Sequence, residues 1–286
     1  MSKLITVFGA TGNQGGSVIR AVLADPVLSK EFRIRGITRD TSKPAAQELK
    51  SKGVEMISAD MSSIESVAPA LKDAHTVFLV TNYWETMSRD IEYKQGKNVA
   101  DAAKAAGVSH LIFSSLINVS EATNGALPNV PHFDGKAEIE KYIRASGVPA
   151  TFVLPGYFMS NLISSLKEKE DGSYQMVLPI SDAARFPLFD VVNDTGKFVA
   201  AVIKNRSSVL GKRIYEAAAS WTQIPVDQWK KFLPPAAAQE ILENNLLLEG
   251  PGYYAGADLK ESYHLLEQKP TTWKEFVAKN RAKFSA

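Results

Sequence analysis

The chain of 286 residues contains no cysteine. This absence excludes disulfide bonds, thiol catalysis and zinc sites of the cysteine type, and it fits a reducing compartment. The chain also has little excess charge of either sign, because 33 basic and 31 acidic residues leave a net charge of +2 at pH 7. There is no basic tail and no helical segment with a basic face that would read DNA. We therefore expect no direct contact with nucleic acid.

Long apolar runs are missing too. No run approaches the ~20 residues that span a bilayer, so we expect no membrane association. The chain enters a predicted strand almost at once, and no signal or transit peptide is evident. The cytoplasm is the expected location, with nuclear entry left open. The 4 histidines have no metal-ligand spacing, and no Gly-x-Ser-x-Gly elbow of a serine hydrolase occurs.

What the chain does have is a glycine cluster directly after its first predicted strand. The apolar stretch 4–8 is rich in β-branched residues, and helical spacing begins at Asn13. Strand, glycine turn and helix form the context in which Gly-x-x-Gly-x-x-Gly indicates dinucleotide binding. An ordinary glycine turn is the weaker alternative. The residues expected to hold a cofactor here are Gly9, Thr11, Gly12, Asn13, Gln14 and Gly15.

Strand and helix patterns alternate through the first half of the chain. Strands are predicted at 4–8, 32–38, 54–59, 76–80, 111–114 and 151–154, with helices between them. This alternation predicts an α/β fold with a doubly wound parallel sheet of the Rossmann type.

The second half loses this alternation. Short strands are predicted at 174–178, 186–189 and 213–218, and helices at 194–204, 225–233, 236–248 and 272–283. We interpret this half as a smaller, mostly helical cap over the carboxyl ends of the strands. The expected division is a dinucleotide-binding Rossmann domain over residues 1–155 and an integrated substrate or cap lobe over 156–286. The sequence leaves the oligomeric state open.

In an open parallel sheet, ligands bind beyond the carboxyl ends of the strands. The second strand ends in Arg39, whose planar guanidinium suits a ribose 2′-phosphate, and Lys43 adds positive charge nearby. This favours NADP(H) over NAD(H). A solvated surface arginine beside Asp40 is the alternative.

The third and fourth strands end in further candidate contacts. Asp60 and Met61 suit an adenine ring, although Asp60 is as compatible with capping the next helix. The fourth strand is followed by a polar pair and two aromatic residues, which suit a ribose contact and a pocket wall. These residues are Thr81, Asn82, Tyr83 and Trp84.

A His-x-x-x-Lys spacing begins a later helix and places His132 and Lys136 on one face of it. Lys136 is positioned to bond the nicotinamide ribose, and His132 is a candidate proton donor at neutral pH. A packing or capping histidine is the alternative. Tyr157 and Phe158, after the sixth strand, are expected to flank the nicotinamide, with core packing as their alternative.

Together these motifs resemble one family, the NmrA-like group of atypical short-chain dehydrogenase/reductases, including its NADP-sensing members. The matching segments run in order from residue 3 to about residue 165. They are the glycine loop 9–15, Thr38-Arg39, the segments 81–85 and 94–97, His132 to Lys136, and 154–158.

The resemblance implies a Rossmann domain with a small C-terminal lobe and NADP(H) as cofactor. It also implies that Lys94, Lys136 and the Tyr157-Phe158 segment line the nicotinamide half of the site. Catalytic short-chain dehydrogenases carry Tyr-x-x-x-Lys, whereas His132 stands at the matching position here. The usual reduction of a simple ketone is therefore in question.

Two functions compete. One is an NADPH-dependent reductase of an imine or iminium, an activated alkene or a carbonyl in a small apolar substrate, with His132 as the acid. Its expected substrate pocket consists of Trp84, Phe133, Phe158 and Phe186. The other is a non-catalytic NADPH/NADP redox sensor or transcriptional regulator that acts through a regulatory protein partner. A redox-neutral rearrangement is a third interpretation.

Overall fold

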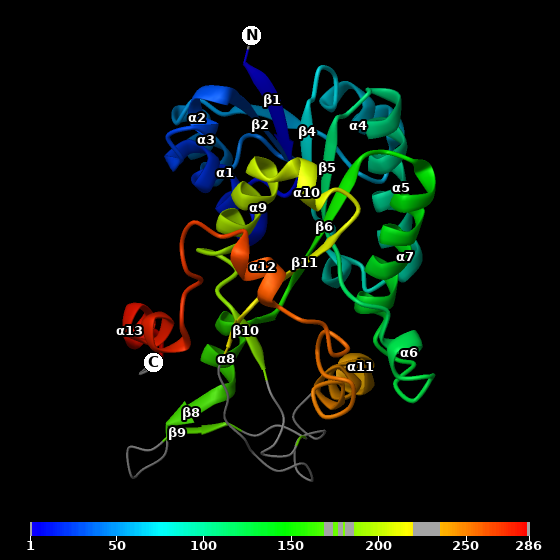
Figure 1. The fold of residues 1–286 in the computed structure, drawn as a ribbon, viewed down its shortest axis with the longest axis vertical. Coiled ribbons are helices and arrows are strands. Elements are labelled where there is room, and N and C mark those ends of the chain that lie inside the picture. The colour runs from blue at the N-terminus through cyan, green and yellow to red at the C-terminus, as the bar shows by residue number, and fades with distance from the viewer. Residues whose placement is uncertain (1, 169–173, 177–179, 181–185, 220–234, 285–286) are drawn as a thin grey trace.

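A seven-stranded parallel sheet forms the centre of the molecule (Figure 1). The computed structural model describes residues 2–168, 174–176, 180, 186–219 and 235–284. The strand order is β11-β6-β5-β4-β1-β2-β3, so the order reverses between β1 and β4. This is the doubly wound sheet that the sequence predicts. The strands are β1 (Lys3–Val7), β2 (Phe32–Thr38), β3 (Glu55–Ser58), β4 (Thr76–Leu79), β5 (His110–Ser114), β6 (Ala150–Pro155) and β11 (Arg213–Glu216).

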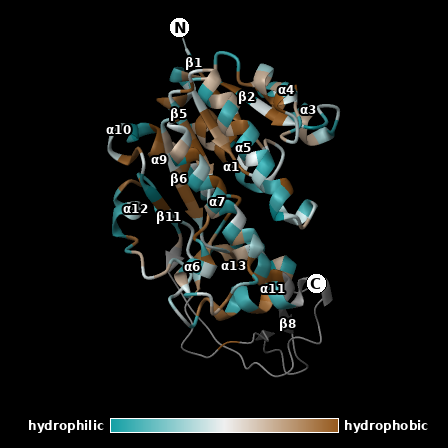
Figure 2. Cartoon of the chain, turned by 90° about the vertical axis from the view of Figure 1, so that its right-hand side faces the viewer, coloured by the Kyte–Doolittle hydropathy of each residue, from teal (hydrophilic) through white to brown (hydrophobic). Residues whose placement is uncertain are grey.

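Helices cover both faces of the sheet, and each face has its own apolar core. One core packs α1 (Asn13–Ala24), α3 (Pro44–Ser51) and α9 (Thr195–Lys204) against the strands. The other packs α4 (Ile64–Ala70), α5 (Arg89–Ala105) and α7 (Pro131–Ser146). Because both faces are covered, β4 and β6 are buried along their whole length and consist mainly of apolar residues. Figure 2 shows the hydrophobic sheet between helices whose outer faces are hydrophilic.

Short elements join these layers. They are α2 (Leu28–Glu31), the 3-10 helix η1 (Tyr83–Glu85), α6 (Val119–Ala122) and α10 (Arg206–Val209). The first of these, α2, directly precedes β2, and η1 follows β4. The 3-10 helix η1 thus stands at the carboxyl edge of the sheet, where it carries the aromatic pair Tyr83 and Trp84.

The C-terminal lobe contains helices and two small sheets. Its helices are α8 (Met159–Ser165), α11 (Pro235–Leu246), α12 (Lys260–His264) and α13 (Trp273–Phe284). A three-stranded sheet joins β7 (Tyr157–Phe158), β10 (Pro187–Phe189) and β12 (Ala218–Ala219), and β8 (Leu166–Glu168) pairs with β9 (Tyr174–Met176). The predicted helix 225–233 lies outside the described residues.

The division of the chain at residue 155 stays a prediction. The structure adds that two later elements lie with the sheet, since α9 packs on α1 and β11 pairs with β6. The chain therefore returns to the first half of the fold after β7, which agrees with lobes that are integrated.

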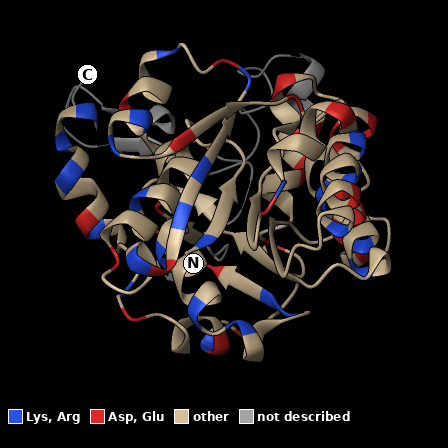
Figure 3. Ribbon diagram, turned by 90° about the horizontal axis from the view of Figure 1, so that it is seen from above, with Lys and Arg blue, Asp and Glu red and all other residues tan. Residues whose placement is uncertain are grey.

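No helix in the described part of the chain is long and apolar enough to cross a membrane. Figure 3 shows basic and acidic residues mixed along the outer helices on the face in view, in keeping with the small net charge.

One buried histidine gives the fold a defined response to acid. His110, at the start of β5, is 1% exposed. Its Nε2 lies 2.9 Å from the hydroxyl of Thr151, which itself donates to the carbonyl of Val209, so the ring donates through Nε2. Its Nδ1 has no hydrogen-bond partner. Burial lowers the pKa of His110 from 6.5 to about 3, so the folded state keeps the ring neutral where the unfolded chain takes up a proton.

We predict that stability falls with pH below about 6.5, by about 2 kcal/mol at pH 5 from His110 alone. The variant His110→Gln should lose less of its unfolding free energy between pH 7 and pH 5, as measured by urea unfolding. His264→Gln is the control, because that histidine is exposed. An equal loss in wild type and His110→Gln would contradict the prediction.

Candidate functional site

The glycine loop joins β1 to α1 with almost no space to spare. Gly9 has φ +62°, a conformation that side chains rarely adopt. A Cβ at Gly15 would lie 2.3 Å from the carbonyl oxygen of Gly9, so only glycine lets the helix approach the strand this closely. No side chain caps α1 at Gly12. The backbone N–H groups of its first turn therefore point to the carboxyl edge of the sheet, where they favour an anion.

A cleft of about 650 Å³ opens beside this loop, where the strand order reverses. It runs past the ends of β1, β2, β3 and β4. Most of the residues predicted to contact the cofactor line it, namely Gly9, Thr11, Gly12, Asn13, Gln14, Gly15, Arg39, Asp60, Met61, Thr81, Asn82 and Phe158.

At one end of the cleft, Arg39 forms an ion pair with Glu85 of η1. The Arg39 side chain is 66% exposed, so solvent can reach the guanidinium. Lys43, by contrast, precedes α3, is exposed and does not line the cleft. Asp60 accepts from the backbone N–H of Ser62 at 2.8 Å, while the cap of α4 is Ser63. The helix-capping alternative for Asp60 is thus wrong, and its side chain remains at the cleft.

A second cavity of about 330 Å³ continues from the cleft, because Gln14, Thr81, Asn82 and Phe158 line both. Its walls are largely aromatic. Six predicted site residues meet here and come from η1, α7 and β7: Tyr83, Trp84, His132, Phe133, Lys136 and Tyr157. We call this second space the aromatic cavity.

Lys136 is held by a network that the sequence does not reveal. Its Nζ donates to the hydroxyl of Thr81 at 2.7 Å, to the carbonyl of Thr81 at 3.1 Å and to Glu92 Oε1 at 2.5 Å. All three ammonium protons are therefore used, and the charge is balanced by a carboxylate that is 1% exposed. Lys136 thus fixes the end of β4 and carries no unpaired charge.

His132 has a partner from the other lobe. Its Nδ1 is paired with Glu240 of α11, and its backbone N–H lies 3.3 Å from the same carboxylate oxygen. Tyr83 donates to the second oxygen of Glu240 at 3.2 Å. Burial, reinforced by this carboxylate, raises the pKa of Tyr83 to about 12, so the phenol stays protonated. With Nδ1 occupied, Nε2 is the ring atom of His132 that remains available to a ligand.

Aromatic rings fix the orientation of the imidazole. The ring centroid of Trp84 lies 4.9 Å from that of His132, and Phe133 packs edge-on from the other side at 4.8 Å. Trp84 is 50% exposed and forms an outer wall of the aromatic cavity. The capping alternative for His132 is wrong, because no side chain caps α7.

Besides Lys43, two predicted residues are not brought to the site. Lys94 is exposed and lines neither cavity; Ile91 and Gln95, on the same helix, line the cleft in its place. Phe186 lies behind the aromatic cavity, where its ring packs edge-on against Tyr157 at 5.0 Å. It supports a wall residue and is itself buried in the core.

Among the site residues missed from sequence are Glu92, Glu240 and Asn244. A signal existed for Glu92, which shares the buried stripe of α5 with Gly96 and Val99 at helical spacing. An acidic residue on such a stripe indicates a buried partner. No local signal marks Glu240, which lies 108 residues from His132 along the chain.

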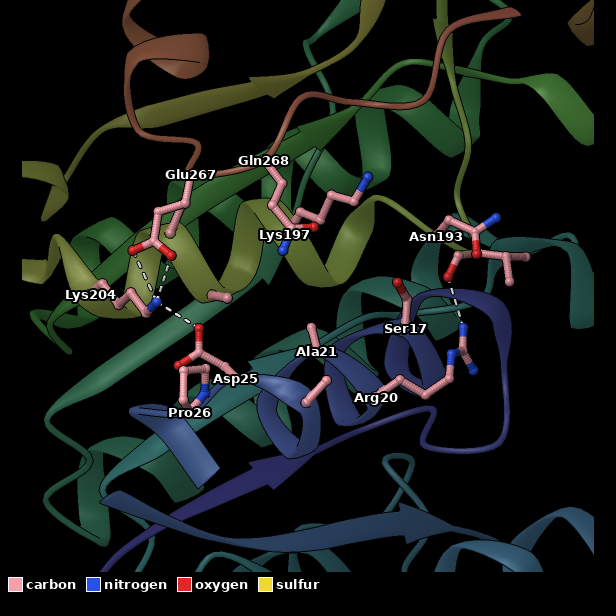
Figure 4. A pocket seen from close by; sticks show the side chains of 14 residues that line it. Ser17, Arg20, Ala21, Asp25, Pro26, Asn193, Lys197, Lys204, Glu267 and Gln268 are labelled. Carbon is pink, nitrogen blue, oxygen red and sulfur yellow. Dashed lines mark hydrogen bonds and ion pairs between the residues drawn. The ribbon is translucent and has the colours of Figure 1, made fainter. Parts of the chain in front are cut away.

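Another cavity, of about 350 Å³, lies between α1 and α9 (Figure 4). Its charged side chains already have partners. Lys204 lies 2.6 Å from Asp25 and 2.8 Å from Glu267, and Arg20 donates to the carbonyl of Val192 at 2.7 Å. It shares no lining residue with the cleft beside the glycine loop, so we do not assign it a ligand. Within the described residues, no group of three His, Asp or Glu side chains is arranged to hold a metal ion.

The comparison with known families agrees with this site. A model of the NmrA-like family matches residues 1–222. The chain belongs to the NmrA-like family. The resemblance predicted from the motifs is therefore confirmed.

Curated relatives within this family carry the name oxidoreductase. The NmrA-like family domain-containing oxidoreductase ptmS of Penicillium ochrochloron is 38% identical over 168 residues, which cover 56% of this chain and 49% of the relative. The corresponding oxidoreductase malD of Malbranchea aurantiaca is 32% identical over 223 residues, covering 72% of this chain and 65% of the relative. The chain thus spans about half the length of the first relative and less than two thirds of the second.

Solved structures share the fold. NmrA, described as a negative transcriptional regulator, superimposes with a TM-score of 0.81 at 20% identity, over 99% of this chain and 98% of NmrA. An NADPH-dependent quinone oxidoreductase from Escherichia coli, solved with NADPH, gives a TM-score of 0.74 at 22% identity, over 96% and 99% of the two chains. NmrA has also been solved with NADP, with a TM-score of 0.77 at 21% identity over 96% and 94% of the two chains.

The buried pair of Lys136 and Glu92 gives a test of this geometry. Lys136→Met leaves an uncompensated buried carboxylate and should lower the free energy of unfolding by about 3 kcal/mol. Adding Glu92→Gln should restore more than half of that loss, as measured by urea unfolding. Lys97→Met is the matched control, because Lys97 and Asp101 form a partly exposed pair on the helix that carries Glu92. Its loss should cost less than about 1 kcal/mol. No recovery in the double variant would argue against the buried pair.

Proposed function

We propose that this protein is an NADPH-dependent reductase that acts on an imine or iminium, an activated alkene or a carbonyl in a small apolar substrate. The observation that carries the proposal is the continuity of the two cavities. A cleft built on a dinucleotide-binding glycine loop opens, past Phe158, into an aromatic cavity with a buried histidine in its wall. The oxidoreductase names of the curated relatives support the same reaction class.

The residues of the cleft fit NADP(H). The open first turn of α1 suits a pyrophosphate, and Arg39 at the end of β2 suits the ribose 2′-phosphate. Arg39 is paired with Glu85 in the structure, so we expect the guanidinium to exchange that carboxylate for the phosphate. When bound, the cofactor supplies a hydride to the electrophilic carbon of a substrate in the aromatic cavity.

His132 is positioned to complete such a reduction. Glu240 holds Nδ1, so an imidazolium donates its other proton from Nε2 to the nitrogen of an imine, or to the oxygen of a carbonyl or enone, as negative charge develops there. An iminium takes up the hydride without this proton, because its nitrogen becomes neutral. The buried carboxylate of Glu240 stabilises that imidazolium, and Tyr83 keeps the carboxylate in place. Lys136 has a structural task in this scheme, because its protons are already bound to Thr81 and Glu92.

A sensor function is the second candidate, and one observation favours it. Glu85, the partner of Arg39, lies in the same 3-10 helix as Tyr83, which donates to Glu240 in the C-terminal lobe. Release of Glu85 by a cofactor phosphate would therefore act on η1 and on its contact with α11. A regulatory protein partner would then recognise that change. NmrA, which shares the fold, is described as a negative transcriptional regulator.

Arg39 gives the sharpest test of the cofactor. Arg39→Ala should weaken NADPH binding by about 10- to 100-fold, the effect of one charged hydrogen-bonding group, and leave NADH binding little changed. Glu85→Gln frees the guanidinium and should tighten NADPH binding. Titration calorimetry measures both. Lys43→Ala is the control, because Lys43 does not line the cleft. An equal loss of NADPH and NADH affinity in Arg39→Ala would show that Arg39 does not read the 2′-phosphate.

The reductase proposal is tested by incubating NADPH-loaded protein with imines, enones and aldehydes and following NADPH absorbance. We expect oxidation with at least one class. Glu240→Gln should lower kcat by about 100-fold and move the alkaline limb of the pH profile to lower pH, with KM little changed. Glu240→Asp should recover part of the rate.

Tight NADPH binding without oxidation of NADPH by any class would reject the reductase and favour the sensor. Retention of the full rate and the same pH profile in Glu240→Gln would remove the pair of His132 and Glu240 from the proton step.

A further inference from the structure

Helix α11 presents two polar side chains to the aromatic cavity from one face. Glu240 and Asn244 are four residues apart, which places them one above the other on a helix. Glu240 reaches the cavity through His132, whereas Asn244 lines the cavity directly. The reductase proposed above explains Glu240 and leaves Asn244 without a role.

The amide of Asn244 has no hydrogen-bond partner in the described part of the protein. Its Oδ1 is completely buried and unpaired. The neighbouring Asn245 also has a buried, unpaired Oδ1, but Asn245 does not line the aromatic cavity, and its Nδ2 donates to the carbonyl of Ile241 at 2.7 Å. Buried polar atoms are rarely left unpaired, since each one costs free energy unless a ligand or water completes it. An unpaired amide in the wall of a cavity therefore points to a ligand group.

The remaining lining of the cavity defines that ligand further. Its two ionisable cationic residues, His132 and Lys136, are each balanced by a carboxylate, Glu240 and Glu92. A ligand with a net charge would find no unpaired counter-charge among the described lining residues, and burial of that charge would be costly. The aromatic walls favour a flat ring.

We propose that Asn244 anchors the substrate, and that the substrate is a neutral aromatic compound with a lactam or secondary amide. A primary amide such as that of Asn244 has a donor and an acceptor side by side. A lactam edge has the complementary pair, so two parallel hydrogen bonds form. The inference rests on the proposed reductase function and names the substrate class of the same site.

The test uses 2-quinolone, a flat neutral lactam, and its N-methyl derivative, which lacks the N–H donor. Both are titrated calorimetrically into the NADP⁺-loaded full chain. Wild type should bind 2-quinolone at least about tenfold more tightly than the N-methyl compound, because the methyl group leaves the Asn244 acceptor unpaired. Asn244→Leu should reduce the preference to less than about twofold. Asn280→Leu on α13 is the matched control and should keep it, because the Asn280 amide bonds within its own helix.

Equal binding of the two compounds by wild type, no binding of either, or a preference kept in Asn244→Leu would each overturn the proposal. Asn244→Ala, with NADP⁺ affinity as the check on folding, replaces Asn244→Leu should that variant not fold. The titration needs no turnover, so its failure is distinct from failure of the reductase proposal. Loss of the lactam preference in Asn244→Leu with NADPH oxidation absent in wild type would keep the binding site and reject the reaction.

Discussion

The close approach of α1 to the end of β1 is the constraint on which the rest of this structure depends. A side chain at Gly15 would collide with the backbone of Gly9, so the helix lies where only glycine permits it. The same turn leaves α1 without a side-chain cap and opens its first N–H groups toward the reversal point of the sheet. Because the cleft begins at this turn, the positions of Arg39, Thr81 and the aromatic cavity beyond them follow from it.

Charge within the site is arranged in pairs. Lys136 is balanced by Glu92, His132 by Glu240, and Arg39 at the mouth of the cleft by Glu85. The first two pairs are buried and hold the floor and wall of the aromatic cavity in place, whereas Arg39 is largely exposed and can exchange its partner. The site therefore combines a rigid apolar end with an adaptable end that can bind an anion. Such a combination suits a charged dinucleotide that meets a neutral substrate.

Local patterns were enough to assign six of the seven strands to the sheet and to predict many of the residues that line the cleft beside the glycine loop. The residues of β2, Phe32 to Thr38, agree with the prediction at both ends. The spacing of Gly9, Gly12 and Gly15 predicts the glycine loop because the turn needs a positive φ at Gly9 and has no room for a side chain at Gly15. The C-terminal lobe was predicted less completely, because its two small sheets have strands of only two or three residues in the described part.

The chemistry of the site depends on long-range contacts that no local pattern records. Glu240 meets His132 only because α11 lies against the start of α7. Phe186 was predicted to line the pocket, but Tyr157 lines it and Phe186 packs behind Tyr157. Lys136 was placed on the correct helix face, yet its protons are used by Thr81 and by Glu92 of another helix. Sequence identifies many of the residues that line the two cavities, and tertiary packing decides which of them remain available to a ligand.

The most direct measurement is a crystal structure of the full chain with NADP⁺. The account predicts that the nicotinamide ring enters the aromatic cavity beside Phe158, within reach of His132, and that Arg39 leaves Glu85 for the 2′-phosphate. A nicotinamide that stays outside the aromatic cavity, or a 2′-phosphate held without Arg39, would contradict the claim that the cleft and the cavity are one site.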